Sequence, residues 1–179
     1  MARRRYRRYR RRSGKWAPNI KEFNADALTE SLGKFYNSAV LTTNPAQAES
    51  LVSQVYTVKN FDINFSIETK MDTEADANVA ARIENLTAYI MFLPQGMNLS
   101  ADYNIQHPEY IMACKYIGSP TSDTPLSAAN PIRVRTRLAR KLQTGDSIIL
   151  FVTGYEEGST NIVLPLTLTG VCRWWTKAN

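Results

Sequence analysis

Residues 61–68 read FDINFSIE, and this stretch decides the fold of the chain. Apolar and polar residues alternate strictly along it, so all of its apolar side chains share one face of an extended segment. A helix would instead repeat its apolar residues every three or four positions. The pattern therefore predicts a strand of an antiparallel sheet, with one face buried and the other in solvent.

Other segments are rich in β-branched and aromatic residues and are separated by turn-forming clusters such as Thr144-Gly145-Asp146. The further predicted strands are residues 36–43, 84–93, 110–117, 132–142, 147–155 and 161–176. Connections of about 10–20 residues favour a jelly roll over a tight meander. We therefore expect an all-β fold, a single jelly-roll antiparallel β-sandwich of about eight strands.

Two short helices are expected beside these strands. The first lies within residues 24–36, where four apolar residues follow helical spacing. These residues are Leu28, Leu32, Phe35 and Tyr36. The second is one or two helical turns that begin at Asn44, which would cap a helix with Pro45 at its first position.

Charge is distributed unevenly along the 179 residues. Residues 1–15 contain nine basic residues and no acidic residue, so they carry a charge of +9. The remaining residues contain thirteen basic and sixteen acidic side chains, a net charge of −3. Because nine like charges repel one another and resist burial, we expect a disordered basic arm over residues 1–17 and a folded domain over residues 18–179.

The composition of the arm points to a polyphosphate partner. Arginine almost replaces lysine in it, and a guanidinium pairs with phosphate oxygens bidentately. Aromatic rings lie between the arginines, and unpaired bases can stack on such rings. We therefore expect the arm to bind single-stranded nucleic acid, although a nuclear localisation signal or a basic patch for a membrane surface has a similar composition. The candidate nucleic-acid-binding residues are Arg3, Arg4, Arg5, Tyr6, Arg7, Arg8, Tyr9, Arg10, Arg11, Arg12, Lys15 and Trp16.

A second basic stretch lies within the predicted strand at residues 132–142. Alternation places Arg133, Arg135 and Arg137 on one face of that strand. Their partners on the other face would be Val134, Thr136 and Leu138. The three arginines are candidates for phosphate contact, and ion pairs within or between subunits explain them equally well.

Few residues suited to catalysis or metal binding are present. His107 is the single histidine and lies beside Pro108 in a predicted loop, with no G-x-S-x-G motif in the chain. Cys114 and Cys172 are far from each other in sequence and lack zinc-ligand spacing, so we expect both to be small core hydrophobes. No glycine-rich phosphate loop occurs. We expect neither enzyme activity nor a metal or cofactor.

Two further observations concern apolar residues. The longest apolar run, Ala88–Leu93, is far shorter than the roughly 20 residues of a membrane span, so no membrane insertion is expected. Trp174 and Trp175 are adjacent in a predicted strand and must point to opposite faces. One of them can enter the core, while the other faces a subunit contact or lies beneath the N-terminal segment.

Four features together suggest a family. An arginine- and tyrosine-rich arm precedes a single all-β domain, which contains residues 107–113 with 115–120 (HPEYIMA and KYIGSP) and residues 135–142 with 144–147 (RTRLARKL and TGDS). In this layout the chain resembles the capsid proteins of small circular single-stranded DNA viruses that encode a replication initiator, the circovirus-like group. The resemblance implies a single jelly roll, about sixty copies of which form a small icosahedral shell, with the arm directed inward onto the packaged genome.

The same resemblance implies partners and a location. The chain would associate with itself and with single-stranded DNA, in the virion and, during assembly, in the host nucleus. Nuclear import machinery and a host receptor are possible further partners. Two other classes fit part of the composition: a non-capsid nucleic-acid-binding β-domain with a basic tail, and a carbohydrate-binding jelly roll, for which the arm would have no purpose.

The arm should bind single strands chiefly by neutralising phosphates. A peptide of residues 1–16 should show a log–log dependence of affinity on salt of about −0.7 per phosphate, near −6 if all nine cations engage. Titration of the peptide with a single-stranded oligonucleotide over a salt series measures this slope. A slope shallower than about −2 would show that the arm is not the packaging element.

Overall fold

The computed structural model describes residues 15–25, 29–31, 33–44, 55–69, 83–118, 131–156 and 166–178. These residues form nine strands and two short helical segments. The strands are β1 (Ala17–Ala25), β2 (Thr29–Ser31), β3 (Lys34–Thr43), β4 (Tyr56–Thr69), β5 (Ile83–Leu93), β6 (Ile111–Gly118), β7 (Ile132–Leu142), β8 (Ser147–Glu156) and β9 (Leu166–Ala178). The helical segments are α2 (Tyr103–Gln106) and the 3₁₀ turn η1 (Pro108–Tyr110).

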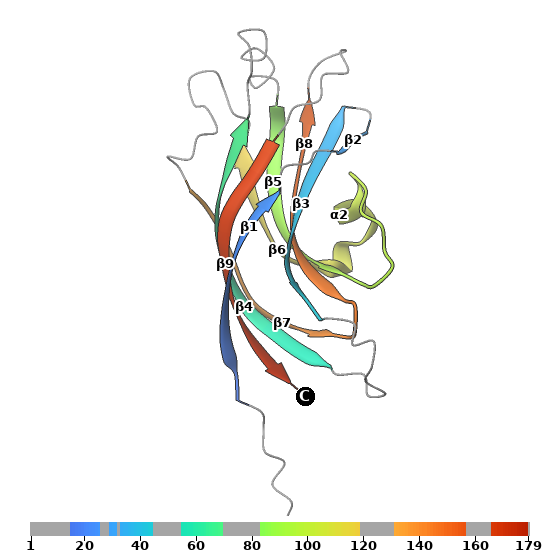
Figure 1. Ribbon diagram of the computed structural model, residues 1–179. Coiled ribbons are helices and arrows are strands. Elements are labelled where there is room, and N and C mark those ends of the chain that lie inside the picture. Colours follow the sequence, from blue (N-terminus) through green and yellow to red (C-terminus); the bar gives the residue numbers. More distant parts are fainter. Residues whose placement is uncertain are drawn as a thin grey trace, which may run out of the picture.

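The strands form two antiparallel sheets that pack face to face (Figure 1). One sheet has the order β1-β9-β4-β7, and the other has the order β2-β3-β8-β5-β6. Without the three-residue β2, each sheet contains four long strands, and the chain passes between the sheets in the order of a jelly roll. The predicted fold class is confirmed.

The main core lies between the two sheets, and β4 shows why it forms there. Phe61, Ile63, Phe65 and Ile67 are each at most 2% exposed, whereas the alternate residues of β4 reach solvent. They pack against apolar side chains of the opposite sheet, including Leu150 of β8. The period-two pattern of residues 61–68 is thus the pattern of a half-buried strand, as predicted.

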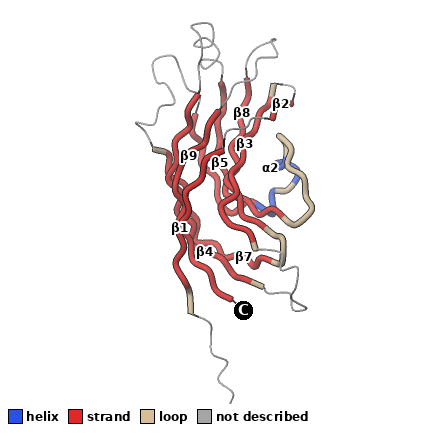
Figure 2. Tube along the Cα trace, viewed as in Figure 1, coloured by secondary structure: helices blue, strands red, loops and turns tan. Residues whose placement is uncertain are grey.

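A second, smaller apolar cluster covers the other face of the five-stranded sheet. It contains Ile149 and Phe151 of β8 together with Tyr103 of α2, whose hydroxyl donates a hydrogen bond to the Phe92 carbonyl at 3.2 Å. The segment of α2 therefore packs beside this sheet (Figure 2). Because the middle of β8 is buried on both faces, its residues 148–152 are all apolar and do not alternate with polar residues.

The helix predicted within residues 24–36 is wrong. Residues up to Ala25 pair with β9, and β3 begins at Lys34, after a turn at Gly33 with φ of 75°. Along β3, burial alternates with period two, so pairing with β8 overrides the helical spacing of Phe35 and Tyr36. Leu28 and Leu32 lie outside the described residues, as do residues 45–54 of the second predicted helix.

The prediction that Trp174 and Trp175 point to opposite faces is confirmed, and the cysteine prediction is half right. Trp174 is 8% exposed and stacks on Phe61 in the core, while Trp175 is 40% exposed on the opposite face. Cys172 is buried, which raises the pKa of its thiol to about 12. Cys114, on the edge strand β6, is exposed.

Gly170 allows β9 to lie close to β4. A Cβ atom at this position would lie 2.5 Å from the Asn64 carbonyl oxygen and 2.6 Å from the Phe65 Cβ. Gly170→Ala should therefore lower the free energy of unfolding by about 1–3 kcal/mol, since backbone atoms must shift. Denaturant unfolding measures the change. Thr169→Ala, at an exposed neighbouring position, is the control, and equal stabilities of the two variants would contradict this account.

Candidate nucleic-acid interface

Basic side chains gather on the outward face of the four-stranded sheet, opposite the core. Arg133, Arg135 and Arg137 are exposed there on β7, between the buried residues Val134 and Thr136. The neighbouring strands β4 and β9 contribute further cations to this surface. We call it the basic face, and it comprises Lys59, Arg133, Arg135, Arg137, Lys141 and Arg173.

The predicted alternation of β7 fails at Leu138, which is 57% exposed and does not enter the core. The register of β4 and β7 shifts at this point: Thr136 lies opposite Phe61, and Ala139 lies opposite Lys59. Arg137 and Leu138 therefore have no register partner in β4. The Leu138 amide donates a hydrogen bond to Thr136 Oγ1 at 3.1 Å, which marks the local kink.

The register brings charges of three strands into one row. Asp62 of β4 lies opposite both Arg135 of β7 and Arg173 of β9. Outward-pointing residues that are directly opposite one another in an antiparallel sheet have neighbouring side chains. The row therefore places one carboxylate between two guanidinium groups.

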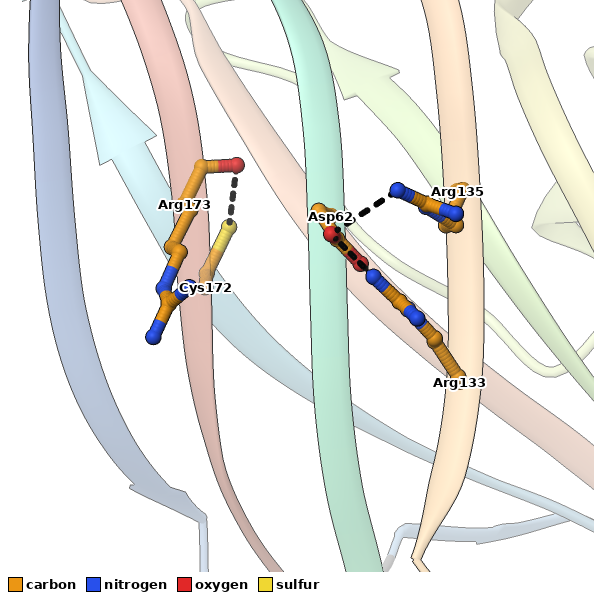
Figure 3. A network of polar contacts seen from close by, with 5 residues as sticks. All are labelled: Asp62, Arg133, Arg135, Cys172 and Arg173. Atoms are coloured by element: carbon orange, nitrogen blue, oxygen red, sulfur yellow. Dashed lines mark hydrogen bonds and ion pairs between the residues drawn. The ribbon is translucent and has the colours of Figure 1, made fainter.

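Asp62 is the centre of an ion-pair network (Figure 3). Arg133 donates to it bidentately, from Nε to Oδ1 at 2.8 Å and from Nη2 to Oδ2 at 2.6 Å. Arg135 Nη2 lies 3.4 Å from Oδ2. The Arg133 hydrogen bonds are the main reason that the pKa of Asp62 is below its ordinary value of 3.8. Ion pairing within the subunit, one of the two roles expected for these arginines, is thus present for Arg133 and Arg135.

One carboxylate cannot neutralise this surface. Arg173 also lowers the pKa of Asp62 through its charge, but its guanidinium points away from that carboxylate (Figure 3). Within the described part of the chain, neither Arg137 nor Arg173 forms an ion pair with a carboxylate. The basic face therefore keeps an excess of positive charge that can attract an anion.

A depression of about 530 Å³ lies within the basic face. Its lining residues come from β4, β7 and β9, and they are Asn60, Phe61, Asp62, Arg135, Thr136, Arg137, Arg173 and Trp175. The cause is an irregularity in β4, where Asn60 has a φ of 55° and the register shifts toward both neighbouring strands. Such bulges break the side-chain alternation and re-aim the neighbouring residues.

The first described residues of the chain lie on this same face. The Lys59 Nζ is 3.9 Å from the centre of the Trp16 ring, a cation–π contact that joins Trp16, near the start of the described residues, to β4. Lys15 precedes it and is exposed. The other arm candidates, Arg3 to Arg12 with Tyr6 and Tyr9, lie outside the described residues.

Sequence reasoning missed Asp62, Lys59, Arg173 and Trp175 as parts of this surface. Alternation left open which of Trp174 and Trp175 faces outward, but it puts Arg173, two residues before Trp175, on the same face as Trp175. Their meeting with β7 depends on the register between strands that are far apart in sequence, which periodicity does not give.

Elsewhere among the described residues, the chemistry-bearing side chains form no comparable site. His107 Nδ1 lies 3.3 Å from Glu109 Oε1, and its ring stacks on Tyr110 in the loop around η1. Among the residues described, no group of three or more His, Cys, Asp or Glu side chains is placed to hold a metal ion. In the same part of the chain, no helix has the length and apolarity to cross a membrane.

The strand order defines the chain as a jelly-roll β-sandwich. No family model and no curated protein sequence matches it. A comparison with solved structures gives, among others, a chain in the structure of infectious bursal disease virus, Gt strain. That match has a TM-score of 0.29 and 8% identity, and it covers 92% of this chain and 37% of the other. A similarity this low carries no argument about function.

Removal of the Asp62 charge should strengthen binding of single strands. Asp62→Asn frees Arg133 and Arg135 for phosphate, so the log–log salt slope of the full chain should become steeper by about 1.4, at 0.7 per additional phosphate contact. Glu22→Gln is the matched control, because Glu22 is an exposed acidic residue of β1 in the same sheet. Identical slopes for the two variants would contradict a role of Asp62 in restraining these arginines.

The same substitution should change the pH dependence of stability. Since the pKa of Asp62 is lowered in the folded state, its ionised form stabilises the fold above pH about 4, and this contribution is lost as the pH falls through the lowered pKa. Asp62→Asn should therefore melt slightly below the wild type at pH 7, and the difference should vanish in strong acid. A difference that is equal at both pH values would contradict this account.

Proposed function

We propose that this chain is a viral capsid protein that assembles into a small icosahedral shell and packages a single strand of nucleic acid. One observation carries the proposal: the contact of Trp16 with Lys59 places the last residues of the arm, 15–17, beside the sheet face that holds Arg133, Arg135, Arg137 and Arg173. Both cationic elements would then act on one polyanion. The jelly roll would form the wall of the shell, and the arm and the basic face would bind the genome.

The electrostatics are sufficient for packaging without sequence recognition. About sixty copies, the number implied by the circovirus-like resemblance, would supply roughly 540 positive charges from their arms alone. Charges in this number neutralise several hundred phosphates of a flexible strand. The basic face would add a second layer of contacts close to the wall.

The same resemblance supplies the type of nucleic acid and the location of the protein in this proposal. The packaged strand is single-stranded DNA, the mature chain belongs to the virion, and the arm doubles as a nuclear localisation signal during assembly in the host nucleus. Nothing in an arginine arm senses a 2′-hydroxyl, so the choice of DNA over RNA depends on this resemblance.

Deletion of residues 2–15 tests the proposal. The deletion should leave the domain folded and able to form particles, but the particles should lose their nucleic acid, since nine of the 22 basic residues are gone and the net charge changes from +6 to −3. Electron microscopy and the ratio of absorbance at 260 and 280 nm after nuclease treatment measure both outcomes.

The matched control replaces the eight arm arginines by lysine, which keeps the charge, and it should keep most of the nucleic acid. Full nucleic-acid content in the deletion particles would contradict packaging by the arm. A full-length protein that remains a single, nucleic-acid-free subunit at low salt would contradict the capsid function. A monomer that binds nucleic acid would support the alternative, a non-capsid nucleic-acid-binding β-domain.

A further inference from the structure

We propose that the depression in the basic face binds one nucleotide of the single strand, with its base against Trp175 and its phosphate between Arg137 and Arg173. The inference rests on the proposed function and deepens it. It assigns a defined contact to Arg173 and Trp175 and explains the break in β4 at Asn60.

The charge of the depression selects an anion. Three guanidinium groups line it, from Arg135, Arg137 and Arg173, against the single carboxylate of Asp62. That carboxylate already accepts two hydrogen bonds from Arg133, so little of its acceptor capacity faces a ligand. Phosphate is the anion that matches a guanidinium fork.

The aromatic wall selects a ligand that also has a planar, apolar part. Trp175 lines the depression and is 40% exposed, although aromatic side chains of this size usually find cover. Phe61 also lines the depression and is held by stacking on Trp174, with ring centres 6.2 Å apart and planes 7° apart. A rigid aromatic surface beside guanidinium groups is the arrangement on which unpaired bases stack.

The size of the depression agrees with a nucleotide. Its volume of about 530 Å³ falls within the roughly 300–1,000 Å³ that is usual for small-molecule sites. A lone phosphate would leave the Trp175 wall uncovered. A base within a duplex is covered on both faces by its neighbours, so only an unpaired nucleotide can present its face to Trp175.

The contact of Trp16 with Lys59 indicates that the nucleotide belongs to a longer strand. Lys59 lies opposite Trp175 in the β4–β9 register and contacts Trp16 at the start of the described chain. A strand held by the arm therefore passes the rim of the depression. The arm supplies affinity that depends on charge, and the depression adds a contact that requires a base.

The test compares two short probes on the full-length chain, a 5′-phosphorylated thymidine tetranucleotide and its abasic analogue with the same phosphates. At about 0.3 M salt, where charge-driven contacts of the arm are weakened, the wild type should bind the thymidine probe about tenfold more tightly. Trp175→Ala should lose most of this preference, except what the rings of Tyr6, Tyr9 and Trp16 contribute, and should leave the affinity for the abasic probe unchanged. Arg173→Ala should weaken the binding of both probes by a similar factor.

Two matched controls belong to this test. Tyr155→Ala removes an exposed aromatic side chain from the other sheet, and Lys141→Ala removes a cation of β7 that does not line the depression. Tyr155→Ala should keep the base preference, and Lys141→Ala should weaken binding less than Arg173→Ala does. Trp175→Tyr, which keeps a ring, should restore much of the preference if the alanine variant folds poorly.

A second measurement locates the contact without a substitution. A tetranucleotide that carries 5-iodouracil should, on irradiation, cross-link to the peptide that contains Trp175. An unchanged base preference in Trp175→Ala, or cross-links confined to other peptides, would overturn the inference. The proposed function is tested separately. It would be contradicted by a failure to form particles, or by full packaging without residues 2–15. These outcomes do not depend on the depression, because the arms supply most of the contacts to the nucleic acid in a shell.

Discussion

The register of β4 between β7 and β9 is the constraint on which the rest of the structure depends. The alternation of residues 61–68 directs Phe61, Ile63 and Phe65 into the core, and a shift of one residue would turn them all into solvent. The same register places Asp62 in one row with Arg135 and Arg173. Core packing and the surface charge pattern are therefore set by a single strand.

The basic face has more guanidinium groups than carboxylates. Asp62 holds Arg133 in a bidentate pair and Arg135 at a longer distance, which keeps like charges in place without cancelling them. The exposed guanidinium groups of Arg137 and Arg173 remain for an anion. A surface of this kind binds a flexible polyanion without reading its sequence, and its affinity falls with salt.

Much of the fold was predictable from the sequence, since the period-two pattern of residues 61–68 and the paired Trp174-Trp175 report burial directly. The helix expected around Phe35 does not form, because pairing of β3 with β8 overrides the helical spacing of the apolar residues. The predicted inward direction of Leu138 is wrong, because the register shift beside Asn60 breaks the alternation of β7. The depression was not predictable, because a bulge and the register of distant strands create it, and neither leaves a periodic signal.

The most direct measurement of the central claim is a cryo-electron microscopy reconstruction of assembled particles. The account predicts that the outward face of the sheet β1-β9-β4-β7 lines the interior of the shell, with non-protein density along Arg137 and Arg173. Particles in which that face is exposed on the exterior, or is buried between subunits, would contradict it.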